Sequence, residues 1–339
     1  MKELKFICAQ PDDVYYTWQV HLWVESLKKI GHSDKAIVLI FTPAYRNKSD
    51  RWQKIIDLYP ETEFVFYKDD ENMVSQKLGV YIPVLRPYCL MRYFKDNPDM
   101  QNKAVFYCDS DILFTEKFDV SKFLDDDVCY MSDTNSYINS SYFDSKVKDV
   151  LPDRLDEYKK IDVLAETAGI AGITREICEK HKDHSGGAQY LLKNIDWTFW
   201  ERMIQDCLFI RSYLMNTNKQ YFKNENAGFQ SWCADMWALL WQLWKRGQET
   251  KVVPELEFAW SPDPISKLQR TTILHNAGIV SDDMGGYPAF YKGKYHLGSD
   301  PFKDDHLYKV YNDEKSKQHC THYYVTQLIE LKNKYNLNY

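Results

Sequence analysis

Two aspartates, Asp109 and Asp111, are the first candidates for chemistry in this sequence. They end the segment Ala-Val-Phe-Tyr-Cys-Asp-Ser-Asp at residues 104–111, so both carboxylates follow an apolar run that is typical of a buried strand. Carboxylate oxygens are the ligands that hard divalent cations prefer, and a cation held there could neutralise a bound diphosphate. The spacing therefore predicts a Mn²⁺ or Mg²⁺ site, and a solvated turn is the alternative explanation.

Short apolar runs alternate with helical patterns in the first third of the chain. The predicted strands lie at residues 4–8, 36–41, 63–67 and 104–108. The predicted helices lie between them, at residues 15–30, 50–58 and 86–94. This alternation predicts an α/β fold with a mainly parallel central sheet flanked by helices, and such sheets bind ligands beyond the carboxyl ends of their strands. The aspartate pair stands at such an end.

Polar loops and longer helices replace the alternation after about residue 135. No Pro/Gly/Ser-rich linker separates the two parts, so we expect halves at 1–135 and 136–339 that are fused in one globular domain. The strongest helical pattern covers residues 229–246, and its apolar face includes Trp232 and Leu239. We therefore expect Trp232 to pack in the core.

Composition narrows the class of protein. The chain has 339 residues and a net charge of −6, which gives no basic footprint for a nucleic acid, although a local basic groove stays open. No run approaches the roughly 18 apolar residues of a membrane span. The eight cysteines are scattered and the start resembles no signal peptide, so we expect a cytoplasmic protein with free thiols. The 25 Tyr, 17 Phe and 10 Trp could fill a core or stack on sugars.

The order of motifs along the chain resembles that of the GT-A glycosyltransferases, which transfer a sugar from a nucleoside diphosphate donor. Asp109-Ser110-Asp111 is similar to the Asp-x-Asp motif that follows a strand in this family. The resemblance implies a GT-A fold with a nucleotide-sugar-binding half at 1–135 and an acceptor-binding, catalytic half at 136–339. It also implies a divalent metal ion, a nucleotide-sugar donor, for which we expect a UDP-sugar contacted by Ser110, and a hydroxyl acceptor that is a glycan, a peptide or a small molecule.

A glycine-rich loop is the next landmark of the family, and Gly186 and Gly187 with Gln189 are its candidates for donor binding. Adjacent glycines let the backbone approach a ligand closely, and their N–H groups can bind sugar hydroxyls. The segment and the Trp-containing stretch 197–201 also look like the Asn-x-Gly loop and following helix of the glycogenin-related hexosyltransferases. A plain turn is the alternative.

Asp235 is the candidate for the family's acidic residue at the start of a helix. Partial burial at the edge of the apolar face could tune this carboxylate for catalysis. In an inverting enzyme Asp235 would be the general base on the acceptor hydroxyl. In a retaining enzyme it would orient the acceptor or stabilise an oxocarbenium-like transition state. An aspartate that merely favours the helix dipole is the alternative.

His275 is the candidate for the C-terminal histidine that completes the metal site in this family. It follows the short apolar run Thr272-Ile273-Leu274, so a strand would present its imidazole at the strand end. A nitrogen ligand would suit Mn²⁺ better than Mg²⁺. A hydrogen-bonded structural histidine is the alternative.

Three further segments could bind the donor. Arg92 lies in the helix before the aspartate pair, where the resemblance implies an arginine that reaches the donor, and Arg86 is the second choice. Gln10 and Tyr15 follow the first strand and could read and stack on a uracil ring. Lys292 lies in a Gly- and Tyr-rich segment that could close over the diphosphate. A surface arginine and an ordinary packed loop are the respective alternatives.

Other functions stay open. The motif order is also similar to that of peptidyl hydroxyproline arabinosyltransferases and serine galactosyltransferases. A phage-type glycosyltransferase acting on modified DNA bases and a non-catalytic carbohydrate-binding relative are the alternatives, and the net charge of −6 counts against the first of these. A haloacid-dehalogenase-type phosphatase would carry its Asp-x-Asp near the start of the domain, and a sugar nucleotidyltransferase would carry an N-terminal glycine-rich phosphate loop. The sequence has neither feature.

Overall fold

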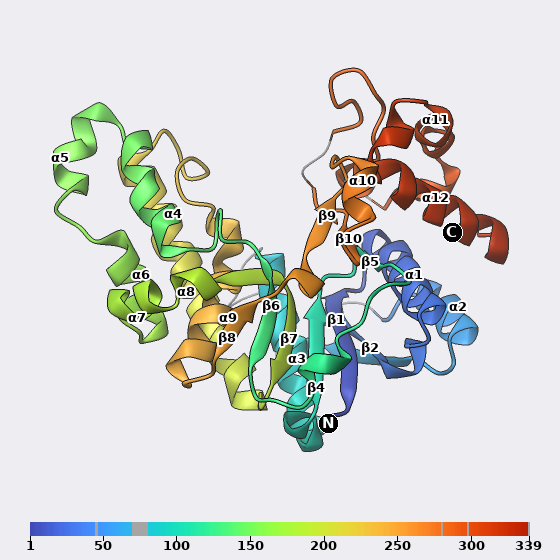
Figure 1. Ribbon diagram of the computed structural model, residues 1–339, viewed down its shortest axis with the longest axis horizontal. Coiled ribbons are helices and arrows are strands. Elements are labelled where there is room, and N and C mark those ends of the chain that lie inside the picture. The colour runs from blue at the N-terminus through green and yellow to red at the C-terminus, as the bar shows by residue number, and fades with distance from the viewer. Residues whose placement is uncertain (45–46, 70–80, 279–280, 297, 338–339) are drawn as a thin grey trace. The chain divides into compact units, whose positions relative to one another are not determined.

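The first third of the chain folds as the alternation predicts (Figure 1). The computed structural model describes residues 1–44, 47–69, 81–278, 281–296 and 298–337. The strands of this part are β1 (Leu4–Pro11), β2 (Ala36–Thr42), β3 (Glu63–Lys68) and β4 (Ala104–Cys108). The helices between them are α1 (Val14–Lys29), α2 (Arg51–Leu58) and α3 (Leu85–Asp96). The predicted order of elements is confirmed.

The strands form two sheets. The later strands are β5 (Ile112–Phe114), β6 (Cys129–Asp133), β7 (Gly186–Lys193), β8 (Thr250–Val252), β9 (Phe258–Trp260) and β10 (Ile273–His275). The order is β3-β2-β1-β4-β7-β6-β8 in a seven-stranded sheet and β5-β10-β9 in a three-stranded one. β1, β2 and β3 pair in parallel, and every residue of β2 is buried, as expected for a strand covered on both faces. The predicted α/β class, a mainly parallel sheet flanked by helices, is confirmed.

Two compact units divide the chain. Among the described residues, the first unit comprises 1–3, 81–106 and 123–253, and the second comprises 4–69, 107–122 and 254–337, apart from the gaps in those ranges. Each unit is therefore assembled from segments that lie far apart in the sequence. The functional halves at 1–135 and 136–339 stay a prediction.

In the second unit, the small sheet joins a segment after β4 to the C-terminal part of the chain. β10 pairs antiparallel with β5, with His275 opposite Ile112, and parallel with β9, with His275 opposite Trp260. The helix α10 (Ile265–Leu268) lies between β9 and β10, and α11 (His306–Asn312) and α12 (Cys320–Tyr335) follow β10. Trp18 of α1 and Tyr324 of α12 belong to one buried cluster, so this core binds the two ends of the unit together.

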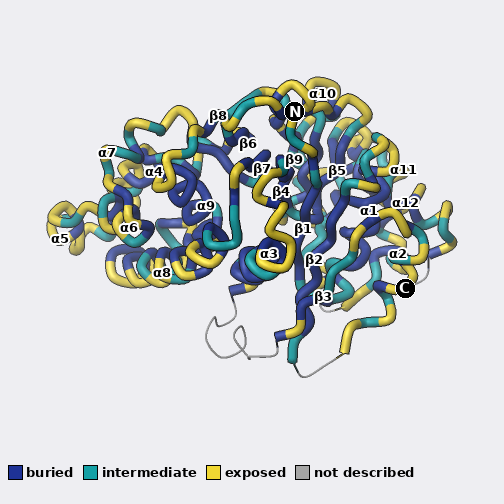
Figure 2. Tube along the Cα trace, turned by 90° about the horizontal axis from the view of Figure 1, so that it is seen from below, coloured by how far each residue is buried: buried dark blue, intermediate teal, exposed yellow. Residues whose placement is uncertain are grey.

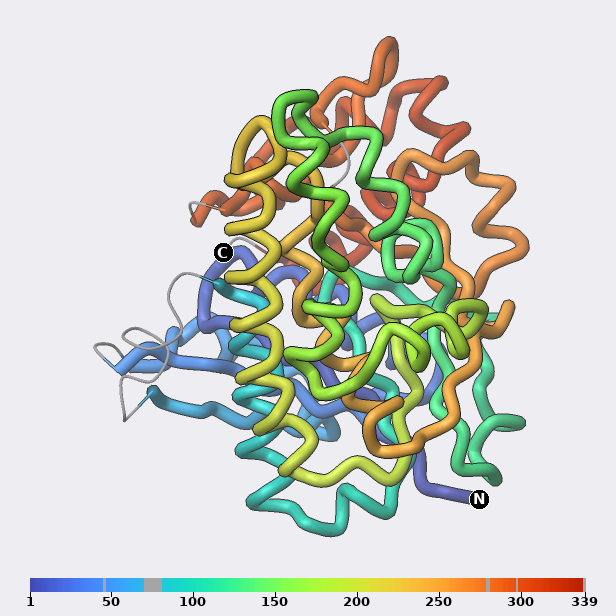
Figure 3. Tube along the Cα trace, turned by 90° about the vertical axis from the view of Figure 1, so that its left-hand side faces the viewer, coloured from blue at the N-terminus to red at the C-terminus, as the bar shows by residue number. Residues whose placement is uncertain are grey.

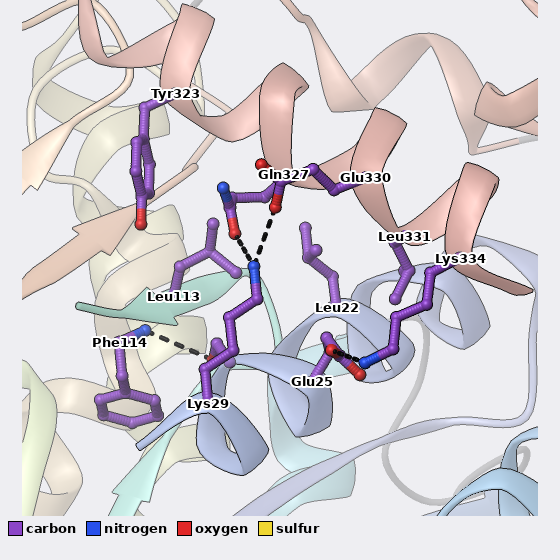
Figure 4. Close-up of a pocket in the computed structure, with 11 residues that line it drawn as sticks. Leu22, Glu25, Lys29, Leu113, Phe114, Tyr323, Gln327, Glu330, Leu331 and Lys334 are labelled. Atoms are coloured by element: carbon purple, nitrogen blue, oxygen red, sulfur yellow. Dashed lines mark hydrogen bonds and ion pairs between the residues drawn. The ribbon is translucent and has the colours of Figure 1, made fainter. Parts of the chain in front are cut away.

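A cavity of about 100 Å³ lies among α1, β5 and α12 (Figure 4). Its charged side chains pair with each other, because Lys29 meets Glu330 at 2.9 Å and Lys334 meets Glu25 at 2.7 Å. Leu113 of β5 lines the same cavity. The ion pairs thus leave little net charge there and tie α12 to α1 around β5, the strand that directly follows the aspartate pair.

The first unit holds a helical layer. Its further helices are α4 (Ser140–Ser145), α5 (Leu155–Tyr158), α6 (Val163–Ala171), α7 (Arg175–Lys180), α8 (Trp197–Tyr221) and α9 (Ala234–Lys245). The long helix α8, yellow-green in Figure 3, packs against both α3 and α9. Among the described residues, no helix has the length and apolar character that crossing a bilayer requires.

The predicted helix at 229–246 begins later than expected. A 3₁₀ turn covers Ser231–Cys233, and α9 begins at Ala234. Much of α9 is buried (Figure 2), including Trp237 and Trp241, but Trp232 is 60% exposed. The expectation that Trp232 packs in the core is therefore wrong. The 3₁₀ turn advances by about 120° per residue rather than 100°, so the apolar face of α9 does not extend back to Trp232.

The predicted glycine-rich loop is a strand, which corrects that expectation. Gly186 and Gly187 open β7, which pairs antiparallel with β6 and shifts register at a bulge between Met131 and Ser132. A Cβ on Gly186 would lie 2.6 Å from Met131 Cγ and closer still to the Ser132 carbonyl oxygen. The glycine is thus needed for close strand packing at the bulge.

Replacing Gly186 by alanine should destabilise the protein. The added Cβ would collide with the β6 backbone, which cannot yield as a flexible side chain would, so we expect a loss of about 1–3 kcal/mol in the free energy of unfolding. The matched control is Gly169→Ala in α6, where a Cβ would meet no atom within 4 Å apart from its chain neighbours and the backbone of its own helix. Chemical denaturation of both variants tests this, and equal midpoints for the two would contradict it.

Candidate functional site

Asp109, Asp111 and His275 come together in the second unit, and we call them the Asp109 cluster. One potential ligand atom from each side chain lies within 4.8 Å of those of the other two. Asp111 and His275 are only 4% and 5% exposed, whereas Asp109 is half-buried. The predicted juxtaposition of these three residues is confirmed. Their role as metal ligands stays a prediction.

Strand pairing explains this arrangement. Asp111 directly precedes β5, and the pairing of β5 with β10 sets His275 opposite Ile112. The backbone N–H of Asn276 donates to the Asp111 carbonyl oxygen at 3.0 Å, which extends the ladder by one bond. The imidazole also packs against Trp260, with 5.0 Å between ring centroids. The backbone therefore fixes the distance between the carboxylate and the imidazole.

The environment of Asp111 favours a charged carboxylate. Burial alone would raise the pKa of Asp111, but the positive charge of Lys292 and the imidazole of His275 outweigh burial and hold this pKa well below its usual range. Lys292 Nζ is ion-paired with Asp111 Oδ2. His275 Nε2 lies 3.4 Å from Asp111 Oδ1, which is buried without a hydrogen-bond partner among the described residues. An ionised carboxylate oxygen facing an imidazole nitrogen fits a divalent cation, and Mn²⁺ accepts this mixed ligand set better than Mg²⁺.

A second group of polar side chains, the Asp235 cluster, lies in the first unit and comprises Tyr81, Arg86 and Asp235. Asp235 is in the first turn of α9, and its Oδ2 pairs with Arg86 of α3 at 2.5 Å. The side chains of Asp235 and Arg86 are 8% and 19% exposed. In this mostly buried position the carboxylate of Asp235 depends on the guanidinium for its counter-charge.

Tyr81 braces this pair. Its hydroxyl oxygen lies 2.7 Å from the Trp232 carbonyl oxygen, to which it donates, and accepts the Asp235 backbone N–H at 3.2 Å. The same oxygen is 3.2 Å from Asp235 Oδ1. Burial, together with the negative charge of Asp235, raises the pKa of Tyr81 well above its usual value, so the hydroxyl stays a donor. Sequence reasoning missed Tyr81, since nothing in its local pattern marks it as polar and functional.

The two arginines of α3 have different neighbours. Arg86 meets Asp235, whereas Arg92 donates to the Tyr88 hydroxyl at 3.2 Å. The structure thus brings the second-choice arginine, not the first choice, to the acidic residue. Arg92 as a donor ligand stays a prediction.

The glycine-containing strand lies next to α9. A Cβ on Gly187 would stand 2.5 Å from Cε of Met236, the residue after Asp235. Gln189 is fully buried, and its Oε1 accepts the Ser132 hydroxyl at 2.6 Å. Gly186, Gly187 and Gln189 are therefore near the Asp235 cluster in the first unit, and their contact with a donor stays a prediction.

The remaining candidates lie in the second unit. Gln10 is 2% exposed, and its amide donates to the Leu39 carbonyl oxygen at 3.0 Å. Tyr15 is 4% exposed and stacks on His296 with 3.9 Å between ring centroids. Ser110 is 7% exposed, between the two aspartates. Both Gln10 and Tyr15 are thus packed groups, and donor binding by any of the three stays a prediction.

Solved structures with a similar arrangement of elements include three glycosyltransferases. The bifunctional glycosyltransferase WbbM shares 12% sequence identity at a TM-score of 0.46. The match covers 97% of this chain but only 49% of the WbbM chain. The galactosyltransferase LgtC, solved with donor and acceptor sugar analogues, shares 10% sequence identity at a TM-score of 0.45, and the match covers 99% of this chain and 97% of LgtC. Mouse xyloside xylosyltransferase 1 shares 8% sequence identity at a TM-score of 0.39, and the match covers 81% of this chain and 97% of that protein. No protein-family model matches the sequence, and no curated protein matches it. The functional argument therefore depends on the two side-chain clusters.

The pairing of Arg86 with Asp235 should be measurable as stability. We expect Arg86→Gln to lower the free energy of unfolding by about 3 kcal/mol, because the mostly buried Asp235 loses its counter-charge. Adding Asp235→Asn should recover part of this loss in a double-mutant cycle. The control is Arg154→Gln, which removes an exposed pair with Glu157 and should cost less than about 1 kcal/mol. If thermal denaturation gives equal losses for Arg86→Gln and Arg154→Gln, the two charges are not coupled as described.

Proposed function

We propose that this protein is a metal-dependent glycosyltransferase, which transfers a sugar from a nucleoside diphosphate donor, a UDP-sugar, to a hydroxyl acceptor. The observation that carries the proposal is the Asp109 cluster, in which two carboxylates and an imidazole converge just beyond the carboxyl end of β4, a strand of the mainly parallel sheet. Ligands of such sheets bind beyond the carboxyl ends of the strands.

In this proposal Asp109, Asp111 and His275 hold a Mn²⁺ or Mg²⁺ ion. When bound, the ion would neutralise the diphosphate as negative charge develops on the leaving group. Lys292, whose ammonium already lies against Asp111, would add a second positive charge for the phosphates. Ser110, Gln10 and Tyr15 are proposed to contact the rest of the donor, the last two at the nucleobase.

Asp235 and Arg86 are proposed to bind hydroxyl groups of the transferred sugar. The donor-binding residues proposed in addition are Gly186, Gly187, Gln189 and Arg92. Asp235 Oδ2 is paired with Arg86, so taking up a proton there would remove the charge that the guanidinium needs. This favours Asp235 as a group that orients the sugar or stabilises positive charge in the transition state, rather than as a general base. That role is the one expected in an enzyme that retains the anomeric configuration of the sugar, and assignment of the product anomer by NMR would test it.

Trp232 is proposed to bind a sugar acceptor. It is the most exposed of the ten tryptophans, and its carbonyl is tied through Tyr81 to Asp235. An exposed indole on a residue whose backbone is linked to the Asp235 cluster suits stacking on the C–H face of a sugar ring. For the location, all eight cysteines are buried and free, which fits the proposed cytoplasmic setting.

Donor hydrolysis should depend on the metal ligands. We expect slow release of UDP from one of a panel of UDP-sugars in Mn²⁺, lost on chelation and restored by adding Mn²⁺ back. Asp111→Asn should lower the rate by about 10²-fold, because one oxygen ligand of the ion is weakened. The control is Asp119→Asn, an exposed aspartate of the same unit, which should keep the wild-type rate. Turnover that is insensitive to chelation and to Asp111→Asn would refute the proposed function.

Truncating Trp232 should weaken acceptor use. We expect Trp232→Ala to raise the KM for p-nitrophenyl glycoside acceptors by about 2- to 10-fold, as the loss of one stacked aromatic face predicts. Phe209→Ala removes an equally exposed ring of α8 and is the matched control. Equal acceptor KM values for both variants would exclude Trp232 from the acceptor site.

A further inference from the structure

We infer that Lys292 is an exchangeable counter-ion of the metal site: its ammonium holds Asp111 while the site lacks a metal, leaves when a divalent cation binds, and then binds the diphosphate. This inference rests on the proposed function and extends it, because it assigns to one side chain the coupling between metal binding and diphosphate binding. Metal binding would thus be weak without the nucleotide and strong with it.

The first step of the argument is occupancy. Lys292 Nζ is ion-paired with Asp111 Oδ2, and the side chains of Lys292 and Asp111 are 14% and 5% exposed. Asp111 is one of the three groups that could hold the ion. An ammonium cannot share a carboxylate oxygen with a divalent cation without strong like-charge repulsion. The cation must therefore displace the ammonium to use both oxygens of this ligand.

The second step is charge. With both carboxylates of Asp109 and Asp111 ionised, the ammonium of Lys292 leaves the cluster without metal at a net charge of −1. Adding a divalent cation to the same groups changes the net charge to +1, and a bound diphosphate would compensate that positive charge. The ammonium, repelled by the metal, would then meet the phosphate oxygens that arrive with it.

The third step is mobility. Lys292 begins a 3₁₀ turn over Lys292–Tyr295, and the residues on both sides of it are fixed, since Phe290 and Tyr295 are 0% and 1% exposed. The Tyr295 hydroxyl donates to Asp304 at 3.0 Å. The backbone therefore stays in place, while the four-carbon stem of lysine lets the ammonium move by a change of rotamer.

The chain offers a matched control two residues away. Lys294 lies in the same turn but pairs with Asp304 at 2.7 Å and Asp282 at 3.8 Å, and its side chain is 39% exposed. Replacing it removes the same charge from the same turn without freeing Asp111. Any effect that is specific to Lys292 must then arise at the Asp109 cluster.

The experiment is Mn²⁺ titration of the full-length protein, followed by the EPR signal of free Mn²⁺, without and with saturating UDP. We expect Lys292→Gln to bind Mn²⁺ about tenfold more tightly than wild type without UDP, because the competing ammonium is gone. UDP should strengthen Mn²⁺ binding strongly in wild type and much less in Lys292→Gln. Lys294→Gln should match wild type in both conditions. Lys292→Arg keeps the charge and should stay near wild type.

Three outcomes would overturn the inference. One is that both proteins bind Mn²⁺ but Lys292→Gln binds it no more tightly than wild type. This result would leave the proposed metal site standing and refute only the displacement of the Lys292 ammonium by the metal ion. Another is that Lys294→Gln gains as much affinity as Lys292→Gln, which reduces the effect to net charge. The third is that neither wild type nor Lys292→Gln binds Mn²⁺ with or without UDP, which removes the metal-dependent function as well. If Lys292→Gln does not fold, an unchanged Mn²⁺ affinity of wild type on adding UDP also overturns the inference.

Discussion

The buried carboxylate of Asp111 is the constraint on which the second unit depends. A charge removed from water is tolerated only beside compensating groups, and here these are the ammonium of Lys292 and the imidazole of His275. Asp111 lies more than 150 positions before His275 and Lys292, which are themselves 17 residues apart. The pairing of β5 with β10 and the packing of Tyr295 hold them in place. The fold around the cluster thus holds a buried carboxylate between an ammonium and an imidazole.

The parts of the structure that the sequence could predict are those fixed by local periodicity. The strands expected at 4–8 and 104–108 are short apolar runs between helical patterns, so their type follows from hydrophobicity alone. The end of β4 at Cys108 follows as well, whereas β1 continues to Pro11. The position of Asp109 and Asp111 at a strand end follows in turn. His275 could be placed because a β-branched run precedes it. In each case the informative signal lies within about ten residues of the site.

The parts that could not be predicted depend on contacts between distant segments. Gly186 resembles a loop residue locally, but its pairing with Asp133 of β6, beyond the register shift between the two strands, makes it a strand residue. Arg86 and Arg92 lie six residues apart on α3, hence about 120° apart around its axis, and only the packing of α3 decides which one meets Asp235. Trp232 lies in a 3₁₀ turn whose phase no helical repeat indicates. Tyr81 acts through a carbonyl and an amide that are 151 and 154 residues away.

The two clusters use the same device with different cations, and the difference bears on what each can do. Asp111 and Asp235 are both buried carboxylates with a basic partner, but lysine presents a compact charge on a flexible stem, whereas arginine presents a planar fork of donors. The Asp235 pair is further fixed by Tyr81, which contacts both its side chain and its backbone. A pair that is held this way suits a permanent hydrogen-bonding frame for a sugar. A carboxylate whose ammonium partner can rotate away suits a site at which that ammonium must be exchanged for a metal ion in each binding event.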